Sequence, residues 1–371
     1  MRGHLVIVGG GLKDDNGAVF NRFAELCAPG PIGIIPIASG DGIAAGEHTA
    51  ERWRKYSGTR PVVVIPLTQN DGAQADAPEI AKQIASCGGL WFTGGDQSRV
   101  VKVLRPEGRR SACLGACFDV LARNGVIGGT SAGAALMSDP MITGGQSHGR
   151  STRDPDEAES TVRFGPGLGF LSGALTDQHF LERGRMGRLV DALHATQVGT
   201  GVGIRENCAL VVHRASGACE PLGRRAVCLL QVQPPLPNSA FSTARLSVLS
   251  TGDRLNIATA MSTPAPGLTL GAPNVPNKPN FPGGPLLDAK LVPDPWEMRT
   301  METALDLFTS GRATVMRENA RVELTLSADS NSQVFVDPAN ARPPCLINIA
   351  LMFRPSVQHQ PLNPPKPNPP K

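Results

Sequence analysis

Short apolar runs alternate with helix-like stretches along the first two hundred residues of the chain. Continuous apolar segments occur at residues 5–8, 32–36, 62–65 and 89–92. Between them, residues 20–27 have a helical pattern, and residues 77–86 place Ile80 and Ile84 on one helical face. Apolar strands separated by helices are typical of a mostly parallel sheet flanked by helices on both faces. We therefore predict an α/β fold with its ligands at the carboxyl ends of the strands.

The composition changes after residue 260. Nineteen of the 33 prolines lie in residues 262–371, mostly in two runs near the start and the end of that segment. Proline at this density favours extended, linker-like chain. Between the runs, the apolar spacing predicts one helix and two strands, at residues 296–308, 321–326 and 345–353. We expect an α/β domain at residues 1–260 and a Pro-rich C-terminal extension at residues 261–371.

Composition and charge narrow the class of protein. The net charge of +4 is small, and no basic run interleaved with aromatics suggests a nucleic-acid face. No apolar window is long enough for a membrane span or an export signal. The eight cysteines lack paired C-x-x-C spacing, so neither a zinc site nor a disulfide framework is indicated. We expect a cytoplasmic protein with reduced thiols, no metal, no cofactor, and no nucleic-acid or membrane partner.

Residues 126–137 carry a candidate nucleophile. A short apolar strand runs into Gly129-Thr130-Ser131-Ala132-Gly133, a Gly-x-Ser-x-Gly turn, and then into a helix-forming stretch. Small residues at Gly129 and Gly133 allow a turn so sharp that the Ser131 hydroxyl stands clear of the sheet. The first N–H groups of the following helix favour a nearby oxyanion. The alternative is a glycine-rich strand-to-helix turn without chemistry.

Two other glycine turns follow predicted strands. Gly94 and Gly95 follow the strand at 89–92, so the N–H of Gly95, together with that of Ala132, is a candidate oxyanion donor. Gln97 would then hold substrate amides, although this stretch is equally suited to a tight turn that caps a helix at 97–104. The run at residues 9–11 lacks the G-x-G-x-x-G spacing of a dinucleotide site. A turn that lets loop and substrate approach closely explains it better.

Among seven histidines, His179 is the candidate base, because it lies near a predicted strand end within Asp177-Gln178-His179-Phe180. The residues around it are those of a binding pocket. Asp177 and Gln178 precede it, and three arginines follow it, at Arg183, Arg185 and Arg188. Arginines so close to a base favour bidentate capture of carboxylates, although a solvated amphipathic helix is the simpler alternative.

A triad also needs an acid that orients the base. Glu206 stands directly before the apolar run 208–212 and is our choice. Competing acids lie in the polar segment 144–160, which we interpret as a loop or lid; they are Asp154, Asp156, Glu157 and Glu159.

Five blocks in this order and spacing resemble the cyanophycinases and their relatives, the aspartyl dipeptidases. The blocks are residues 92–97, 129–134, 165–170, 177–188 and 203–207. The resemblance implies a class I glutamine amidotransferase-like serine peptidase with a Ser131, His179, Glu206 triad. It also implies a homodimer that needs no metal and cuts cyanophycin, a poly-aspartate chain with arginine on each β-carboxyl, to β-Asp-Arg dipeptides. The family's pocket residues match Gln97, Asp177, Gln178, Arg183, Arg185 and Arg188.

One departure from the family pattern lies beside the triad. The family usually has an acidic residue where Arg205 stands, and a cation there could lower the pKa of Glu206 or compete with His179 for its carboxylate. The resemblance therefore leaves two alternatives to cyanophycin hydrolysis. One is an aspartyl dipeptidase or isopeptidase of the same family, and the other is a non-catalytic polymer-binding homologue.

Overall fold

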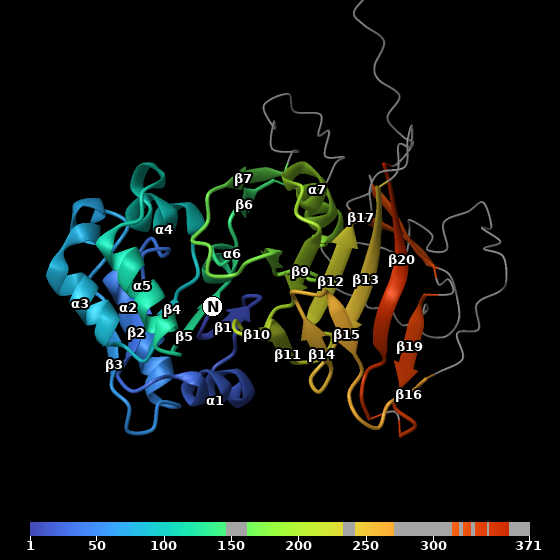
Figure 1. Cartoon of the computed structure of the whole chain (residues 1–371), viewed down its shortest axis with the longest axis horizontal. Helices are drawn as coiled ribbons and strands as arrows, with labels where there is room; N and C mark the ends of the chain where they lie inside the picture. Colours follow the sequence, from blue (N-terminus) through green and yellow to red (C-terminus); the bar gives the residue numbers. More distant parts are fainter. Residues whose placement is uncertain are drawn as a thin grey trace, which may run out of the picture.

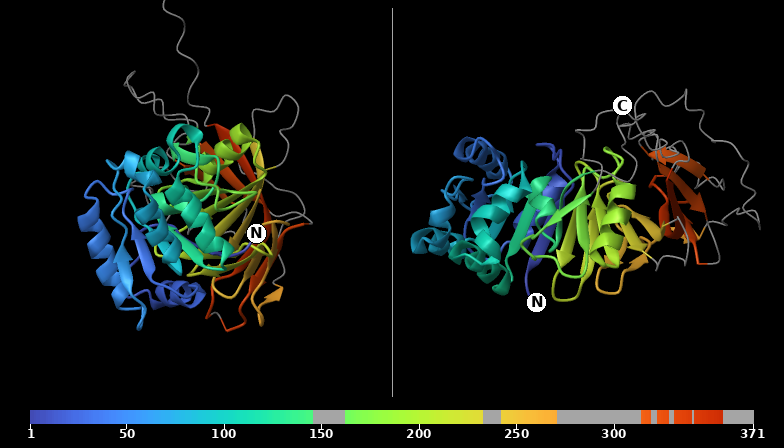
Figure 2. Two further views of the ribbon diagram at one scale, coloured as in Figure 1. Left: turned by 60° about the vertical axis from the view of Figure 1, so that its left-hand side comes forward. Right: turned by 90° about the horizontal axis from the view of Figure 1, so that it is seen from above.

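The computed structural model describes residues 1–145, 162–232, 242–270, 314–318, 322–327, 331–339 and 341–355. Two large sheets form its centre. The helix-flanked N-terminal sheet lies at one end of the long axis and the C-terminal strands lie at the other (Figures 1 and 2). This confirms a mixed α/β fold.

The first sheet begins with the predicted strands. Five parallel strands make one half of it, β1 (His4–Val8), β5 (Val126–Thr130), β4 (Gly89–Phe92), β2 (Ile32–Ile35) and β3 (Val62–Val64). Beyond β1 the described part of the sheet continues with antiparallel strands, β10 (Ala209–His213), β11 (Ala218–Leu222), β14 (Arg254–Asn256) and β15 (Met261–Thr263). The strand order is β15-β14-β11-β10-β1-β5-β4-β2-β3.

Helices bury both faces of the parallel half. On one face, α1 (Gly17–Leu26) and α2 (Ile43–Arg54) place Phe23 and Trp53 against Val6 and Val8 of β1. On the other face, Leu5 and Ile7 join a second core. Its helices are α3 (Pro78–Ser86), α4 (Gln97–Leu104) and α5 (Ala112–Ala122). The continuous apolar run Leu5–Val8 of β1 is explained by burial on both faces of the sheet, as the sequence pattern indicated.

The second sheet corrects the prediction of a mostly parallel architecture. Only β8 (Leu175–Gln178) and β9 (Thr200–Ile204) pair in parallel in its described part. The sheet continues antiparallel through β12 (Val227–Val232), β13 (Ser242–Leu249), β20 (Cys345–Pro355), β19 (Gln333–Val336) and β16 (Thr269–Leu270). In this sheet the connection from β19 to β20 has only residues 337–344, and parallel pairing needs a longer crossover.

The predicted extension contributes strands to this second sheet. β20 pairs along β13 with Leu246 opposite Ile349, and β18 (Val322–Ser327), which pairs with β17 (Thr314–Glu318), adds to the far side of β20. The two predicted strands of the extension are therefore present. The predicted helix at 296–308 and most of the two proline runs lie outside the described residues, and the domain boundary at residue 260 stays a prediction.

Smaller elements surround the second sheet. Helix α7 (Met186–Thr196) packs on it, and β6 (Met141–Gly144) pairs with β7 (Arg163–Gly165). A 3-10 turn at Gly72–Asp76 lies between β3 and α3, and another at Pro106–Gly108 lies between α4 and α5. Within the described ranges, no helix is both long and apolar enough to cross a membrane.

Candidate active site

Three strand ends bring Ser131, His179 and Glu206 together. Ser131 follows β5, His179 follows β8, and Glu206 lies two residues beyond β9. The Ser131 Oγ lies 2.8 Å from His179 Nε2, and His179 Nδ1 is hydrogen bonded to Glu206 Oε1. Serine, imidazole and carboxylate thus form one chain of hydrogen bonds, which is the arrangement that a serine nucleophile requires. Sequence reasoning placed Ser131 and His179 at strand ends and Glu206 before a strand; in the fold Glu206 also follows a strand end, that of β9.

The turn at Ser131 is as sharp as the Gly-x-Ser-x-Gly pattern predicts. Ser131 has φ 55° and ψ −111°, and a four-residue helix, α6 (Ala132–Ala135), begins directly after it. A β-carbon on Gly129 would lie 2.5 Å from the carbonyl oxygen of Gly133, so the turn closes only with glycine there. A serine held in such a rarely populated conformation is a frequent mark of a functional site.

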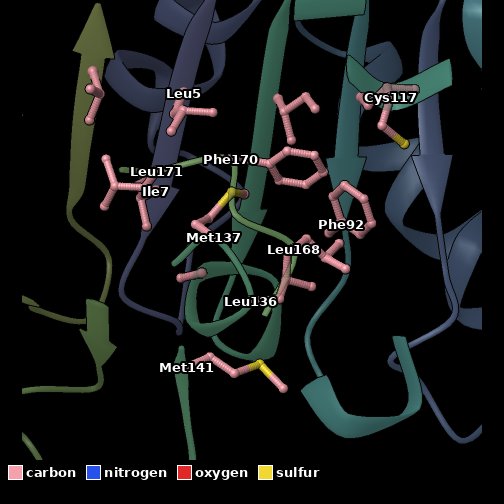
Figure 3. Packing of buried hydrophobic residues seen from close by; sticks show 14 of the residues in the cluster. Leu5, Ile7, Phe92, Cys117, Leu136, Met137, Met141, Leu168, Phe170 and Leu171 are labelled. Atoms are coloured by element: carbon pink, nitrogen blue, oxygen red, sulfur yellow. The ribbon is translucent and has the colours of Figure 1, made fainter. Parts of the chain in front are cut away.

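A packed layer holds this turn from beneath. Leu136 and Met137, which follow α6, lie among Ile7, Phe92 and Phe170 (Figure 3). Leu136 and Met137 are fully buried. Because densely packed interiors resist displacement, the nucleophile is fixed relative to both β1 and β4.

The glycine run at 9–11 connects the two halves of the site. The Gly9 carbonyl accepts a 2.6 Å hydrogen bond from the backbone N–H of His179, and the Gly10 carbonyl accepts one of 2.7 Å from that of Asn207. This run follows β1 of the first sheet, whereas His179 follows β8 of the second. The sequence favoured a turn for close approach, and in the structure the group that approaches the loop is the imidazole of His179.

Two asparagines that sequence reasoning missed secure the same loop. Asn207 has φ 54°, and its Oδ1 accepts hydrogen bonds from Lys13 N and Asn16 Nδ2. Asn16 also caps helix α1 by accepting from the N–H of Val19. Asparagine tolerates the left-handed region and caps helices well, so Asn207 and Asn16 carried a readable local signal. Together they fasten the loop before α1 to the loop that carries Glu206.

The candidate oxyanion donors lie next to the nucleophile. A β-carbon on Gly94 would lie 3.6 Å from Cβ of Ser131, so the Gly94-Gly95 turn borders the serine. Asp96 N donates to the carbonyl of Ala38 across 2.9 Å, which fixes this turn on the neighbouring strand end. Ala132 is the first residue of α6, and the first N–H groups of a helix have no partner within it. The donor roles of Gly95 and Ala132 stay predictions.

The predicted pocket residues form hydrogen bonds with one another and with the small β6–β7 hairpin. Arg188 holds Asp177 bidentately, through Nε at 2.9 Å and Nη2 at 2.6 Å, and both side chains are buried. Arg188 also donates to the carbonyl of Gly145 at 3.0 Å, and Gln97 Nε2 donates to that of Ile142 at 2.9 Å. Asp177 and Arg188 therefore neutralise each other, and their contact with substrate stays a prediction.

The other three predicted pocket residues lie in the segment around His179; they are Gln178, Arg183 and Arg185. Arg185 Nη1 donates to the carbonyl of Gln178 at 2.7 Å, and burial lowers the pKa of Arg185 to about 10, against the opposing charge of Asp177. The Gln178 Oε1 is buried and has no hydrogen-bond partner within the described residues. Arg183 is exposed. Gln178 and Arg183 thus offer an acceptor and a cation beside the base.

Burial lowers the pKa of His179 below its ordinary value of 6.5. The hydrogen bond that Glu206 accepts from the imidazole opposes this effect, and the charges of Arg183 and Arg185 add to it. The side chain is therefore neutral at neutral pH, which is the state in which an imidazole accepts a proton. Both the geometry and the lowered pKa are what a general base needs, and the catalytic role of His179 stays a prediction.

Arg205, which the sequence suggested could compete with His179 for the Glu206 carboxylate, pairs with Glu182. The Nε of Arg205 donates to Glu182 Oε1 at 2.7 Å, and the other carboxylate oxygen, Oε2, accepts from the backbone N–H of Glu206 at 3.2 Å. The cation therefore has a carboxylate partner other than the triad acid. Sequence reasoning missed Glu182, because nothing local connects it with Arg205.

The competing acids Asp154, Asp156, Glu157 and Glu159 lie outside the described residues, as does the predicted lid from residue 146 on.

Comparison with known proteins identifies the family of this chain. Residues 5–218 match peptidase family S51. The chain is 33% identical over 242 residues to a cyanophycinase of Synechococcus elongatus, covering 62% of this chain and 70% of that protein. It is 30% identical over 278 residues to a cyanophycinase of Geminocystis herdmanii, covering 69% and 94%.

A solved structure supports the fold. The crystal structure of a peptidase from an acI-B1 Actinobacterium matches with a TM-score of 0.51 at 17% identity, covering 69% of this chain and 97% of that one. Since the family match spans more than half of the sequence and includes Ser131, His179 and Glu206, the chain belongs to peptidase family S51.

Proposed function

We propose that this serine-type peptidase hydrolyses cyanophycin to β-Asp-Arg dipeptides. The observation that carries the proposal is the hydrogen-bonded chain from Ser131 Oγ through His179 to Glu206. The relatives that match over most of their length are cyanophycinases, which supports the choice of substrate.

In the proposed mechanism, Ser131 Oγ attacks the carbonyl carbon of a backbone peptide bond while His179 Nε2 takes the hydroxyl proton. The N–H groups of Gly95 and Ala132 donate to the oxyanion of the tetrahedral intermediate. The protonated His179 gives its proton to the leaving amine, and Glu206 stabilises the imidazolium through Nδ1. Water, deprotonated by the same imidazole, then releases the acyl group and restores Ser131.

The arginines suit the substrate's chemistry. Each arginine of cyanophycin carries a free α-carboxylate, and in this proposal the exposed guanidinium of Arg183 pairs with it bidentately. Beneath Arg183, the floor of the proposed pocket is formed by Arg185, Asp177 and Arg188. The side chains of Gln97 and Gln178 would hydrogen bond to the amides of the substrate. In this arrangement Arg188 and Asp177 shape the pocket, and Arg183 binds the ligand charge.

The test is release of β-Asp-Arg from purified cyanophycin, measured by chromatography. Replacement of Ser131 (Ser131→Ala) should abolish release, whereas the matched change at an exposed serine, Ser172→Ala, should leave it unchanged. An unchanged rate in Ser131→Ala would rule out the mechanism. Short α-linked aspartyl peptides, assayed in parallel, separate an aspartyl dipeptidase from a cyanophycinase. Polymer binding without release or labelling of Ser131 by a fluorophosphonate would identify a non-catalytic homologue.

On the family resemblance, we further propose a class I glutamine amidotransferase-like fold class, a homodimer and a cytoplasmic location. Light scattering of the purified chain tests the oligomeric state, and cell fractionation tests the location.

A further inference from the structure

Glu182 lies between the loops that carry the two partners of Ser131. It stands three residues after His179, in the turn that joins β8 to α7, while its carboxylate reaches the loop after β9. There Oε2 accepts the N–H of Glu206 and Oε1 accepts Nε of Arg205. One carboxylate therefore connects the base-bearing turn with the acid-bearing loop.

The Glu182–Arg205 pair is largely buried, and the turn that carries Glu182 is hydrogen bonded. The side chains of Glu182 and Arg205 are 14% and 12% exposed, so the pair interacts in a medium that screens charge poorly. The turn itself is ordered by its own bonds, since Arg183 N donates to the carbonyl of His179 at 3.0 Å and Arg185 N to that of Phe180 at 3.0 Å. Because β8 and β9 are paired in parallel with Gln178 opposite Ile204, both loops leave the same edge of the sheet.

From these contacts we infer that Glu182 is a positioning residue for the triad acid, and that Arg205 balances its charge. Glu182 fixes the backbone of Glu206 so that the Glu206 carboxylate stays on His179 Nδ1. Arg205 keeps the negative charge of Glu182 from adding to that of Glu206. In this inference the pair positions the Glu206 carboxylate, and Arg205 does not compete with His179 for it. The inference rests on the proposed function of the triad.

The experiment measures the rate at which a fluorophosphonate labels Ser131, across pH, because labelling depends on the triad and needs no peptide substrate. Glu182→Ala removes both acceptors, so labelling and kcat should fall about tenfold to a hundredfold, the effect of losing a hydrogen bond to a charged group. KM should stay within about twofold, since Glu182 holds the acid and the substrate is bound elsewhere.

Charge changes give the sharper readout. Arg205→Gln removes one positive charge near His179 and Glu206, which favours the imidazolium form of His179. The acid limb of the labelling profile should therefore move to higher pH. Glu182→Gln removes one negative charge near the imidazole, which disfavours the imidazolium, and should move the limb to lower pH. The double variant Glu182→Gln/Arg205→Gln has neither charge and keeps an acceptor for Glu206 N–H. It should return the limb to the wild-type position, which a merely structural role would not predict.

A control removes a partly buried ion pair elsewhere. Glu220 bonds Arg22 and His213 near the start of β1, whereas the triad lies beyond the end of β1. Glu220→Gln should leave the labelling rate and its profile unchanged. Wild-type rates and limbs in all three single variants, Glu182→Ala, Glu182→Gln and Arg205→Gln, would overturn the inference while leaving the triad intact. Failure of the wild-type chain to label at Ser131 would instead overturn the proposed function.

Discussion

A β-carbon on Gly10 would lie 2.2 Å from Cε1 of the His179 ring, so glycine at this position lets the imidazole rest against the loop after β1. We expect Gly10→Ala to displace the ring from Ser131 and to lower kcat by about 100-fold, the effect of misplacing a catalytic group by about an ångström. The dipeptide-release assay measures the loss.

The control separates this clash from the backbone cost. Gly173 also has a positive φ, of 79°, but a β-carbon there would meet no atom within 4 Å. Gly173→Ala should therefore cost about 1 kcal/mol of stability for its backbone conformation and leave kcat unchanged. Equal activity losses in the two variants would show that the imidazole does not depend on Gly10.

The pH dependence of the enzyme should follow His179. Because its pKa is lowered from 6.5, activity should rise through a midpoint below pH 6.5 and be complete at neutral pH, where the base is unprotonated. Arg183 contributes to the lowering, so Arg183→Gln should raise the pKa and move the acid limb to higher pH. Labelling of Ser131 across pH measures this without confusing it with substrate binding.

Salt and a distant charge provide the checks on this prediction. Arg183 is exposed, so its effect on the limb should shrink at high ionic strength. Arg54 lies on α2 in an exposed pair with Glu47, and Arg54→Gln removes the same charge away from the base. A limb that moves equally in both variants would mean that net charge, not the place of Arg183, sets the profile.

The buried pair of Asp177 and Arg188 should dominate the stability of this region. Asp177→Asn leaves the guanidinium buried without its carboxylate, and we expect a loss of about 3–5 kcal/mol in the free energy of unfolding. Urea denaturation measures it. The exposed pair Arg54 and Glu47 is the matched comparison, where Glu47→Gln should cost less than about 1 kcal/mol. A small loss in Asp177→Asn would mean that water reaches Arg188.

The strand β20 should be required for the second sheet. Leu246 and Val248 of β13 are fully buried beside it, so a chain that ends at residue 260 would expose a long apolar edge. We expect this truncated chain to aggregate, and the full-length variant Ile349→Ala, in a fully buried position, to lose about 2–5 kcal/mol while staying folded. A soluble, active chain of residues 1–260 would instead support the predicted domain boundary.

Local signals in the sequence were sufficient for the parallel half of the first sheet and for the candidate triad. The strands of that half are continuous apolar runs, Ser131 lies in a recognisable turn, and His179 and Glu206 stand beside strands. Long-range pairing had no such signal. Periodicity could not place Ile349 opposite Leu246 across about a hundred residues, nor indicate that the later strands turn back antiparallel.

The same limit applies within the site. The sequence showed a cation beside Glu206 but could not show where it points, and in the fold Arg205 donates to Glu182. It also suggested close approach at residues 9–11 without identifying His179 as the neighbour. These relations depend on strand ends of two sheets meeting, which is a property of the assembled chain.

Ser131 belongs to the first sheet and His179 to the second, and Glu206 lies on the connection from β9 of the second to β10 of the first. Backbone hydrogen bonds join the two sheets here, from His179 N–H to the Gly9 carbonyl and from Asn207 N–H to the Gly10 carbonyl. A newly made or damaged chain whose sheets have come apart has a serine without its base. Under the proposed mechanism, hydrolysis therefore requires both sheets to be folded and in contact.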